Sequence, residues 1–254
     1  MTRALAKSYL LSIYFMLYFP IGILILYSFN ATRFSLLWHH FSGRWYHELW
    51  RDQDLWLAFF HSLVLGFCAS LIATLMGFLA CTRLFINQKP NQPLFTLLFL
   101  LIVLPDLVFG IALLVFFNCL GLQLGFTSLL IAHITFCLPF VIVMLNNHMK
   151  SININLYYSA VDLGASHYRA LTHVILPLVW PGLLSAFLLG LTLSFDDVMI
   201  SYFIAGPEFN ILPLTLYSLV RAGITPELNA LCSVIFLLSM LLVIVAQRLI
   251  RRPE

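Results

Sequence analysis

Three aspartates stand inside otherwise apolar stretches of this sequence. Asp106 directly follows Pro105, and Asp196 and Asp197 are adjacent near the end of another apolar run. A charged side chain at the centre of a bilayer costs at least about 2.5 kcal/mol on insertion scales, so it normally faces a cavity or a partner. No Lys or Arg lies deep in these runs. The carboxylates therefore predict a pathway for a cation, whereas an anion carrier would be expected to offer Arg, Lys or helix N-termini.

The residues around the paired aspartates repeat with helical spacing. Gly190, Ser194, Asp197 and Ser201 are 4, 3 and 4 residues apart. In a continuous helix this spacing places them on one face. The pattern predicts that Asp197 lies on a small, polar stripe that lines a pathway, with Asp196 pointing roughly 100° away. We expect Asp197→Asn to weaken cation transport while leaving assembly intact.

Two aromatic residues flank the same segment. Phe195 and Tyr202 could present their ring faces to a bound ammonium group and add cation–π contacts to charge pairing. The alternative for the aspartates is structural. Asp106 after Pro105, or Asp196, would then cap a broken helix or bond a neighbouring subunit.

The composition indicates the environment in which these residues lie. Hydrophobic residues make up 62% of the chain and charged residues 9%, against roughly 45–50% and about 25% in soluble domains. So few charges cannot cover a water-facing surface, and we therefore expect an integral membrane protein. The five cysteines lie in apolar runs without CxxC spacing, which predicts neither a disulfide framework nor a zinc site. No basic run with interleaved aromatics indicates nucleic-acid binding.

Six apolar stretches are long enough to cross a bilayer, which takes about 20 helical residues. The predicted fold is an all-α membrane protein with a single permease domain over 1–254. Prolines inside the spans are expected to mark kinks or span ends. The spans are predicted at about 8–29, 56–82, 94–119, 126–146, 178–204 and 229–249.

The loops indicate the orientation. Nine of the 13 Lys and Arg residues fall on one side if both ends share it, and an excess of Lys and Arg marks the cytoplasmic side. Both termini are therefore expected in the cytoplasm. The first apolar run exceeds the roughly 7–15 residues of a signal peptide's apolar region, so we interpret it as a retained helix.

Catalytic and cofactor motifs are not found in the sequence. It has no P-loop and no Ser-His-Asp arrangement, so we expect no enzyme activity, no bound cofactor and, if transport is ATP-driven, a separate ATPase chain. His39, His40 and His47 beside Glu48 match no standard metal-ligand spacing. The outer loop that holds them, with Glu208 and Glu227, is a better candidate for docking a substrate-delivery protein.

The cytoplasmic stretch of about 147–176 carries the most specific motif. It is predicted to form two short helices joined at Gly164, where glycine permits a positive φ. It resembles the EAA loop of the permeases of bacterial ABC importers, whose pattern is Glu-Ala-Ala, three residues, Gly, nine residues and Ile-x-Leu-Pro. Tyr158 stands at the usual glutamate position, a departure that leaves the contact with the partner open. The residues assigned to ATPase coupling are Tyr158, Ser159, Ala160, Asp162, Gly164, Val174, Leu176 and Pro177.

The resemblance extends over nearly the whole chain and is strongest to the second permease subunit of spermidine/putrescine importers. It implies the type I ABC importer fold, a second permease subunit, a cytoplasmic ATPase dimer and a periplasmic polyamine-binding protein. The matching segments, in order, are Phe29-Asn30, Arg33-Phe34, Arg44–Tyr46, Pro105-Asp106, Gly121–Phe126, His133–Val141, Leu193–Val198, Gly206-Pro207, Ile211–Leu214 and Asn229–Leu231.

The function expected from the sequence is a permease subunit that imports polyamines across the bacterial inner membrane by alternating access. The expected pathway residues are Asp197, Asp196, Asp106, Phe195, Ser194 and Tyr202. One alternative is the same machine with another cation, such as thiamine or ferric ion. A second is a proton-coupled secondary transporter or channel, which would need no ATPase.

Overall fold

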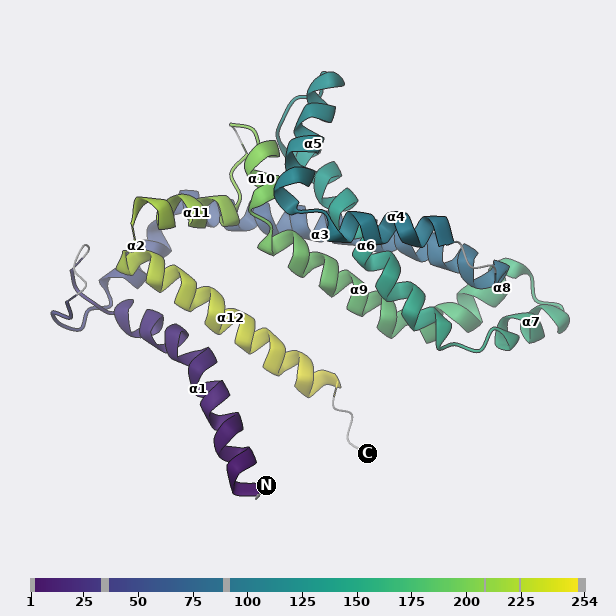
Figure 1. Ribbon diagram of the computed structural model, residues 1–254, viewed down its shortest axis with the longest axis horizontal. Helices are drawn as coiled ribbons and strands as arrows, with labels where there is room; N and C mark the ends of the chain where they lie inside the picture. Colours follow the sequence, from purple (N-terminus) through teal and green to yellow (C-terminus); the bar gives the residue numbers. More distant parts are fainter. Residues whose placement is uncertain (1–2, 33–36, 89–91, 208, 224, 251–254) are drawn as a thin grey trace. The chain divides into compact units, whose positions relative to one another are not determined.

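The architecture is described from a computed structural model, which covers residues 3–32, 37–88, 92–207, 209–223 and 225–250 (Figure 1). These residues are helical apart from loops and one isolated bridge between Asn30 and Phe41. The helices are α1 Arg3–Tyr27, α2 Arg44–Arg51, α3 Gln53–Asn87, α4 Gln92–Val103, α5 Asp106–Cys119, α6 Phe126–Lys150, α7 Asn155–Asp162, α8 His167–Ala170, the π-helical turn η1 Leu171–Ile175, α9 Leu176–Asp196, α10 Met199–Ile204, α11 Leu212–Ala222 and α12 Pro226–Ile250.

The apolar helices confirm a membrane protein with several spans. Over the described residues, four helical stretches are long and apolar enough to cross a bilayer: Lys7–Tyr27, Gln53–Asn87, Phe126–Lys150 and His167–Asp196. The bent pair α4 and α5 makes a fifth if it counts as one span. The sixth predicted span coincides with α12, of which Pro226–Leu241 forms a shorter apolar helix.

The expectation that a proline inside a span marks a kink or a span end is confirmed at Pro105, within the span predicted at 94–119. The chain bends by 105° between α4 and α5, and Pro105 stands at the break with φ −59° and ψ 133°. Proline has no N–H for the helix and its ring pushes the preceding residue out of the helical region, so a helix usually ends there. Pro139 and Pro181, by contrast, remain inside α6 and α9.

The prediction of one continuous helix over 178–204 was wrong. Helix α9 ends at Asp196 and α10 begins at Met199, with Asp197 in an extended conformation between them (φ −72°, ψ 121°). No proline or glycine marks this break in the sequence. Its cause lies in the side-chain contacts of Asp197.

The chain forms two compact units, residues 1–56 with 215–254, and residues 57–214. In the second unit α6 and α9 lie side by side, and small residues permit the close approach. The carbonyl of Gly190 on α9 accepts a hydrogen bond from Cys137 Sγ on α6 at 3.4 Å. A Cβ on Gly190 would also lie 3.2 Å from the Cβ of Ser70, which belongs to α3. Helices α5 and α10 form a second close pair.

The first unit packs α12 against α1 and α2. Its loop is folded around Asn30, whose carbonyl accepts the indole N–H of the buried Trp45 at 2.7 Å. The side chain of Asn30 donates to Leu37 O at 3.1 Å and accepts from His39 N at 3.2 Å. Part of the predicted docking loop therefore has a defined conformation. Three residues named from the sequence lie outside the described residues: Arg33, Phe34 and Glu208.

Candidate functional site

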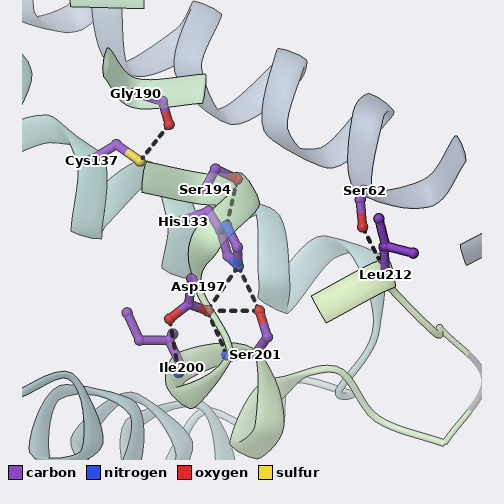
Figure 2. Close-up of polar contacts among 9 residues, drawn as sticks. All are labelled: Ser62, His133, Cys137, Gly190, Ser194, Asp197, Ile200, Ser201 and Leu212. Carbon is purple, nitrogen blue, oxygen red and sulfur yellow. Dashed lines mark hydrogen bonds and ion pairs between the residues drawn. The ribbon is translucent and has the colours of Figure 1, made fainter. Parts of the chain in front are cut away.

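The break between α9 and α10 is built around the carboxylate of Asp197 (Figure 2). Its Oδ1 accepts the backbone N–H of Ile200 at 3.1 Å, and its Oδ2 accepts the backbone N–H of Ser201 at 2.9 Å. The hydroxyl of Ser201 donates to the same Oδ2 at 2.7 Å. A helix start leaves N–H groups without partners in the helix, and Asp197 supplies acceptors for two of them.

His133 connects α6 to both sides of this break. Its Nδ1 lies 2.7 Å from the hydroxyl of Ser194 on α9, and its Nε2 lies 3.0 Å from the hydroxyl of Ser201 on α10. Nε2 is also 3.6 Å from Oδ2 of Asp197. All four side chains are buried, with exposed fractions of 0% for His133 and Ser201, 4% for Ser194 and 7% for Asp197. The cluster of His133, Ser194, Asp197 and Ser201 is hereafter the polar cluster.

The polar cluster contains three of the four residues of the predicted stripe. The reasoning from one continuous helix face was wrong, because the helix breaks at Asp197. Ser194, Asp197 and Ser201 nevertheless meet, since all three contact His133. Gly190 lies apart and packs against Ser70. Of the structural roles considered for the aspartates, the cap belongs to Asp197 and not to Asp196.

The other predicted pathway residues are more accessible. Asp196 and Asp106 are exposed, and Asp106 begins α5 directly after the break at Pro105. Tyr202 is 57% exposed, and Phe195 is half-buried with an edge contact to Phe59 at 6.3 Å between ring centroids. The structure thus separates the set into buried residues, Asp197 and Ser194, and more accessible ones.

The two helix breaks belong to helices that touch. A Cβ on Gly110 of α5 would lie 3.2 Å from the Cα of Ile200 in α10, so the two backbones are in close contact. Asp106 begins the first of these helices, and Asp196 directly precedes the break before the second. Both carboxylates are therefore next to points where a membrane helix is interrupted. Interrupted helices with polar groups are typical of substrate sites in membrane transporters.

Sequence reasoning assigned no role to His133. It noted the residue only as part of the matching segment His133–Val141. A usable signal was present, because an ionisable side chain inside an apolar span is by default a functional candidate. The partners on the other helix, by contrast, are not visible from the spacing of residues in α6.

The predicted helix–Gly–helix segment is confirmed. Helix α7 ends just before Gly164, which has φ +91°. The N–H of Gly164 donates to Val161 O at 2.9 Å and that of Ala165 to Ala160 O at 3.0 Å, the pair of bonds that defines a Schellman motif. Ser166 then caps α8 by accepting the N–H of Arg169 at 3.3 Å.

One feature of this segment differs from the prediction. The fifth span was predicted from about residue 178, but α8, η1 and α9 run as one helical stretch, His167–Asp196. Pro177 has no N–H, so the carbonyl of His173 lacks its usual donor four residues on, and the wider π-helical turn lies at this point. The second short helix is therefore continuous with the fifth span, and a displacement of it would act directly on α9.

Two tyrosines of α7 form hydrogen bonds to neighbouring helices. The hydroxyl of the buried Tyr157 lies 2.7 Å from Nδ1 of His167 on α8, and Tyr158 donates to the carbonyl of Ile86, near the end of α3, at 3.2 Å. The residues assigned to coupling are placed as follows: Tyr158, Ser159, Ala160 and Asp162 in α7, Gly164 in the turn, Val174 in η1, and Leu176 and Pro177 at the start of α9. Leu163 is 89% and Tyr168 75% exposed, so the segment presents apolar side chains at its surface.

Comparison with known families identifies the class of protein to which this fold and these two regions belong. The family model for the inner membrane component of binding-protein-dependent transport systems matches residues 69–252. The chain belongs to this family, and it is a multi-pass permease component.

Curated relatives agree over nearly the full length. The chain is 42% identical to the spermidine/putrescine transport system permease protein PotC of Escherichia coli K12 over 98% of this chain and 95% of the relative. It is 39% identical to the Haemophilus influenzae protein of the same name, over 98% of this chain and 97% of that one. It is 33% identical to the putrescine transport system permease protein PotI of E. coli K12, over 86% and 81%.

Solved structures confirm the fold. A chain of a bacterial ABC transporter involved in the import of the acidic polysaccharide alginate matches with a TM-score of 0.69 at 18% identity, over 98% of both chains. A chain of the MetNI methionine ABC transporter matches with a TM-score of 0.65 at 19% identity, over 79% of this chain and 97% of that one. The predicted type I ABC importer permease fold is therefore confirmed.

Proposed function

We propose that this chain is one of two transmembrane subunits of an ATP-driven importer that carries polyamines such as spermidine and putrescine across the bacterial inner membrane. The relatives named for these substrates support the substrate class. The single structural observation that carries it is that Asp106 and Asp196 are exposed at the breaks of two contacting membrane helices. Carboxylates at two positions suit a flexible chain with several ammonium groups.

The partners follow from the same proposal. A second permease subunit completes the pathway, a cytoplasmic ATPase dimer binds the segment around Gly164, and a periplasmic binding protein delivers the substrate. ATP is held by the ATPase, and this chain binds no cofactor. Both termini are in the cytoplasm, which places α7 and α8 on the ATPase side. The apolar exposure of Leu163 and Tyr168 supports a docking role for this segment.

The mechanism is alternating access. Closure of the ATPase dimer moves the α7–α8 segment, and the continuous helix from His167 to Asp196 carries that displacement to the break beside the polar cluster. Phe195 and the exposed Tyr202 add ring faces near the carboxylates. Release to the cytoplasm follows hydrolysis.

The test is uptake of labelled spermidine and putrescine into vesicles that contain this chain and its neighbouring subunits, with and without ATP. We expect ATP-dependent uptake that is inhibited by other polyamines and is not inhibited by thiamine or ferric ion. ATP-dependent uptake of thiamine or iron instead would refute the polyamine proposal. Uptake driven by a proton gradient without ATP would identify a secondary transporter.

The role of the carboxylates is tested in the same assay. A hydrogen bond to a charged group contributes roughly 1.5–3 kcal/mol, so Asp106→Asn and Asp196→Asn should each raise the KM for spermidine about tenfold or more. Asp54→Asn is the matched control, because Asp54 is an exposed aspartate in the first turn of α3 and is distant in sequence from both breaks. An equal rise in all three variants would refute a specific role.

A further inference from the structure

We propose that His133 is a positioning residue that fixes the interruption of the fifth span, and that Asp197 serves this interruption while its neighbour Asp196 meets the transported cation. The proposal deepens the proposed function, since it assigns different roles to the two adjacent carboxylates of the same pathway.

The hydrogen bonds of the polar cluster have one consistent direction when His133 is neutral. The Ser201 hydroxyl donates its proton to Asp197 Oδ2, so its oxygen accepts from Nε2–H of His133. With the proton on Nε2, Nδ1 is an acceptor, and it receives the hydroxyl of Ser194. The chain of donors runs from Ser194 through His133 and Ser201 to the carboxylate, and each member has a partner.

Asp197 has little capacity left for a substrate. Its two oxygens already accept three hydrogen bonds, and only 7% of the residue's surface is exposed. Binding an ammonium group there would require breaking the cap of α10. Asp196 is exposed, and no hydrogen bond or ion pair of its side chain is found among the described residues.

His133 is suited to hold the interruption because it reaches both sides of it. One ring nitrogen contacts Ser194, three residues before Asp197, and the other contacts Ser201, four residues after. The residue itself lies on α6, which packs along α9. Loss of the imidazole would free α10 to rotate relative to α9 and would change the direction in which Asp196 points.

The test is a double-mutant cycle on spermidine KM in the assembled transporter. We expect Asp196→Asn to raise KM about tenfold or more. His133→Leu should raise it similarly. The double variant should exceed Asp196→Asn by no more than about twofold, which is the scatter seen even where two sites are independent. A rise in KM of the double variant that equals the product of the two single rises would overturn the positioning role.

Asp197→Asn separates the two carboxylates. Its remaining carbonyl oxygen can take the place of Oδ2 and accept both bonds from Ser201, whereas the amide nitrogen replaces Oδ1 and loses the bond from the N–H of Ile200. Because two of the three cap bonds remain, we expect a rise in KM well below that of Asp196→Asn. A rise equal to that of Asp196→Asn would overturn the assignment and would instead agree with the expectation from helical spacing. If the wild-type complex takes up no polyamine at all, the proposed function fails and the cycle does not apply.

A measurement that needs no substrate tests the geometry even if the wild-type complex takes up no polyamine, or if a variant loses uptake because it misfolds. Asp196→Cys should react with a cationic thiol reagent, and His133→Leu should slow this reaction about tenfold, a change of about 1.4 kcal/mol. His133→Gln, whose amide can still donate to Ser201, should restore most of the rate. Equal rates in all three backgrounds would overturn the proposal.

Discussion

Gly164→Ala is the substitution that most directly tests the docking segment. Gly164 follows the end of α7 with φ +91°, and a Cβ there would meet nothing within 4 Å. The substitution therefore creates no clash and adds only the cost of placing an L-residue in a left-handed conformation, about 1–2 kcal/mol. Such a cost changes an equilibrium by a factor of roughly 5 to 30.

Gly121 offers a matched control. It has φ +65°, a Cβ on it would also meet nothing within 4 Å, and it follows α5 with the same pair of bonds, from Gly121 N to Asn118 O and from Leu122 N to Phe117 O. Gly121→Ala therefore adds a similar backbone cost at a turn outside the docking segment. Gly164→Asn is a milder variant, because Asn tolerates this conformation better than Ala.

The assay is copurification of the ATPase together with ATP-dependent uptake. We expect Gly164→Ala to weaken ATPase binding about fivefold or more, Gly164→Asn to weaken it less, and Gly121→Ala to leave it unchanged. Wild-type binding and uptake in Gly164→Ala would show that docking does not need this turn. Equal losses in Gly164→Ala and Gly121→Ala would assign the effect to general destabilisation.

Three further outcomes are expected. Gly110→Val should lower the free energy of unfolding of the purified complex by about 1–3 kcal/mol, the usual cost of a small-to-large change in a packed site. The reason is that a Cβ at this position would lie 3.2 Å from the backbone of Ile200; an unchanged melting temperature would contradict the close contact. Cys119, exposed at the end of the third predicted span, should react with a membrane-impermeant thiol reagent from the periplasmic side, while the buried Cys81 should not; the reverse would invert the orientation. Tyr157→Phe should lose about 1 kcal/mol from the α7–α8 contact, measured as faster proteolysis of that segment, and unchanged cleavage would show that the hydroxyl is dispensable.

The sequence predicts the helical segments well because apolar length alone determines which segments can cross a bilayer. It also predicts the turn at Gly164, since the glycine stands where a left-handed residue ends a short helix. It does not predict the size of the bend at Pro105. Proline marks a possible end, but whether a helix continues depends on neighbouring helices, as the uninterrupted helix at Pro139 shows.

The candidate site was predicted in part. The carboxylates were found because charge is rare in apolar runs, and Ser194 and Ser201 because of their spacing. The break at Asp197 could not be found from local sequence, because the contacts around it include His133, about sixty residues earlier in the chain. A long-range hydrogen bond leaves no trace in the periodicity of one segment, and without it Asp196 and Asp197 appear equivalent.

The two interrupted helices have a consequence for how the site can change. At each break the last carbonyls of one helix have no donor within that helix, and in a bilayer such groups must face water or protein. Main-chain carbonyls attract an ammonium group whatever side chain follows, and no substitution deletes them. Mutational scanning should therefore find residual cation affinity even without Asp106 and Asp196. Over evolutionary time, the side chains around the breaks can alter which cargo is preferred while the backbone preserves a polar lining.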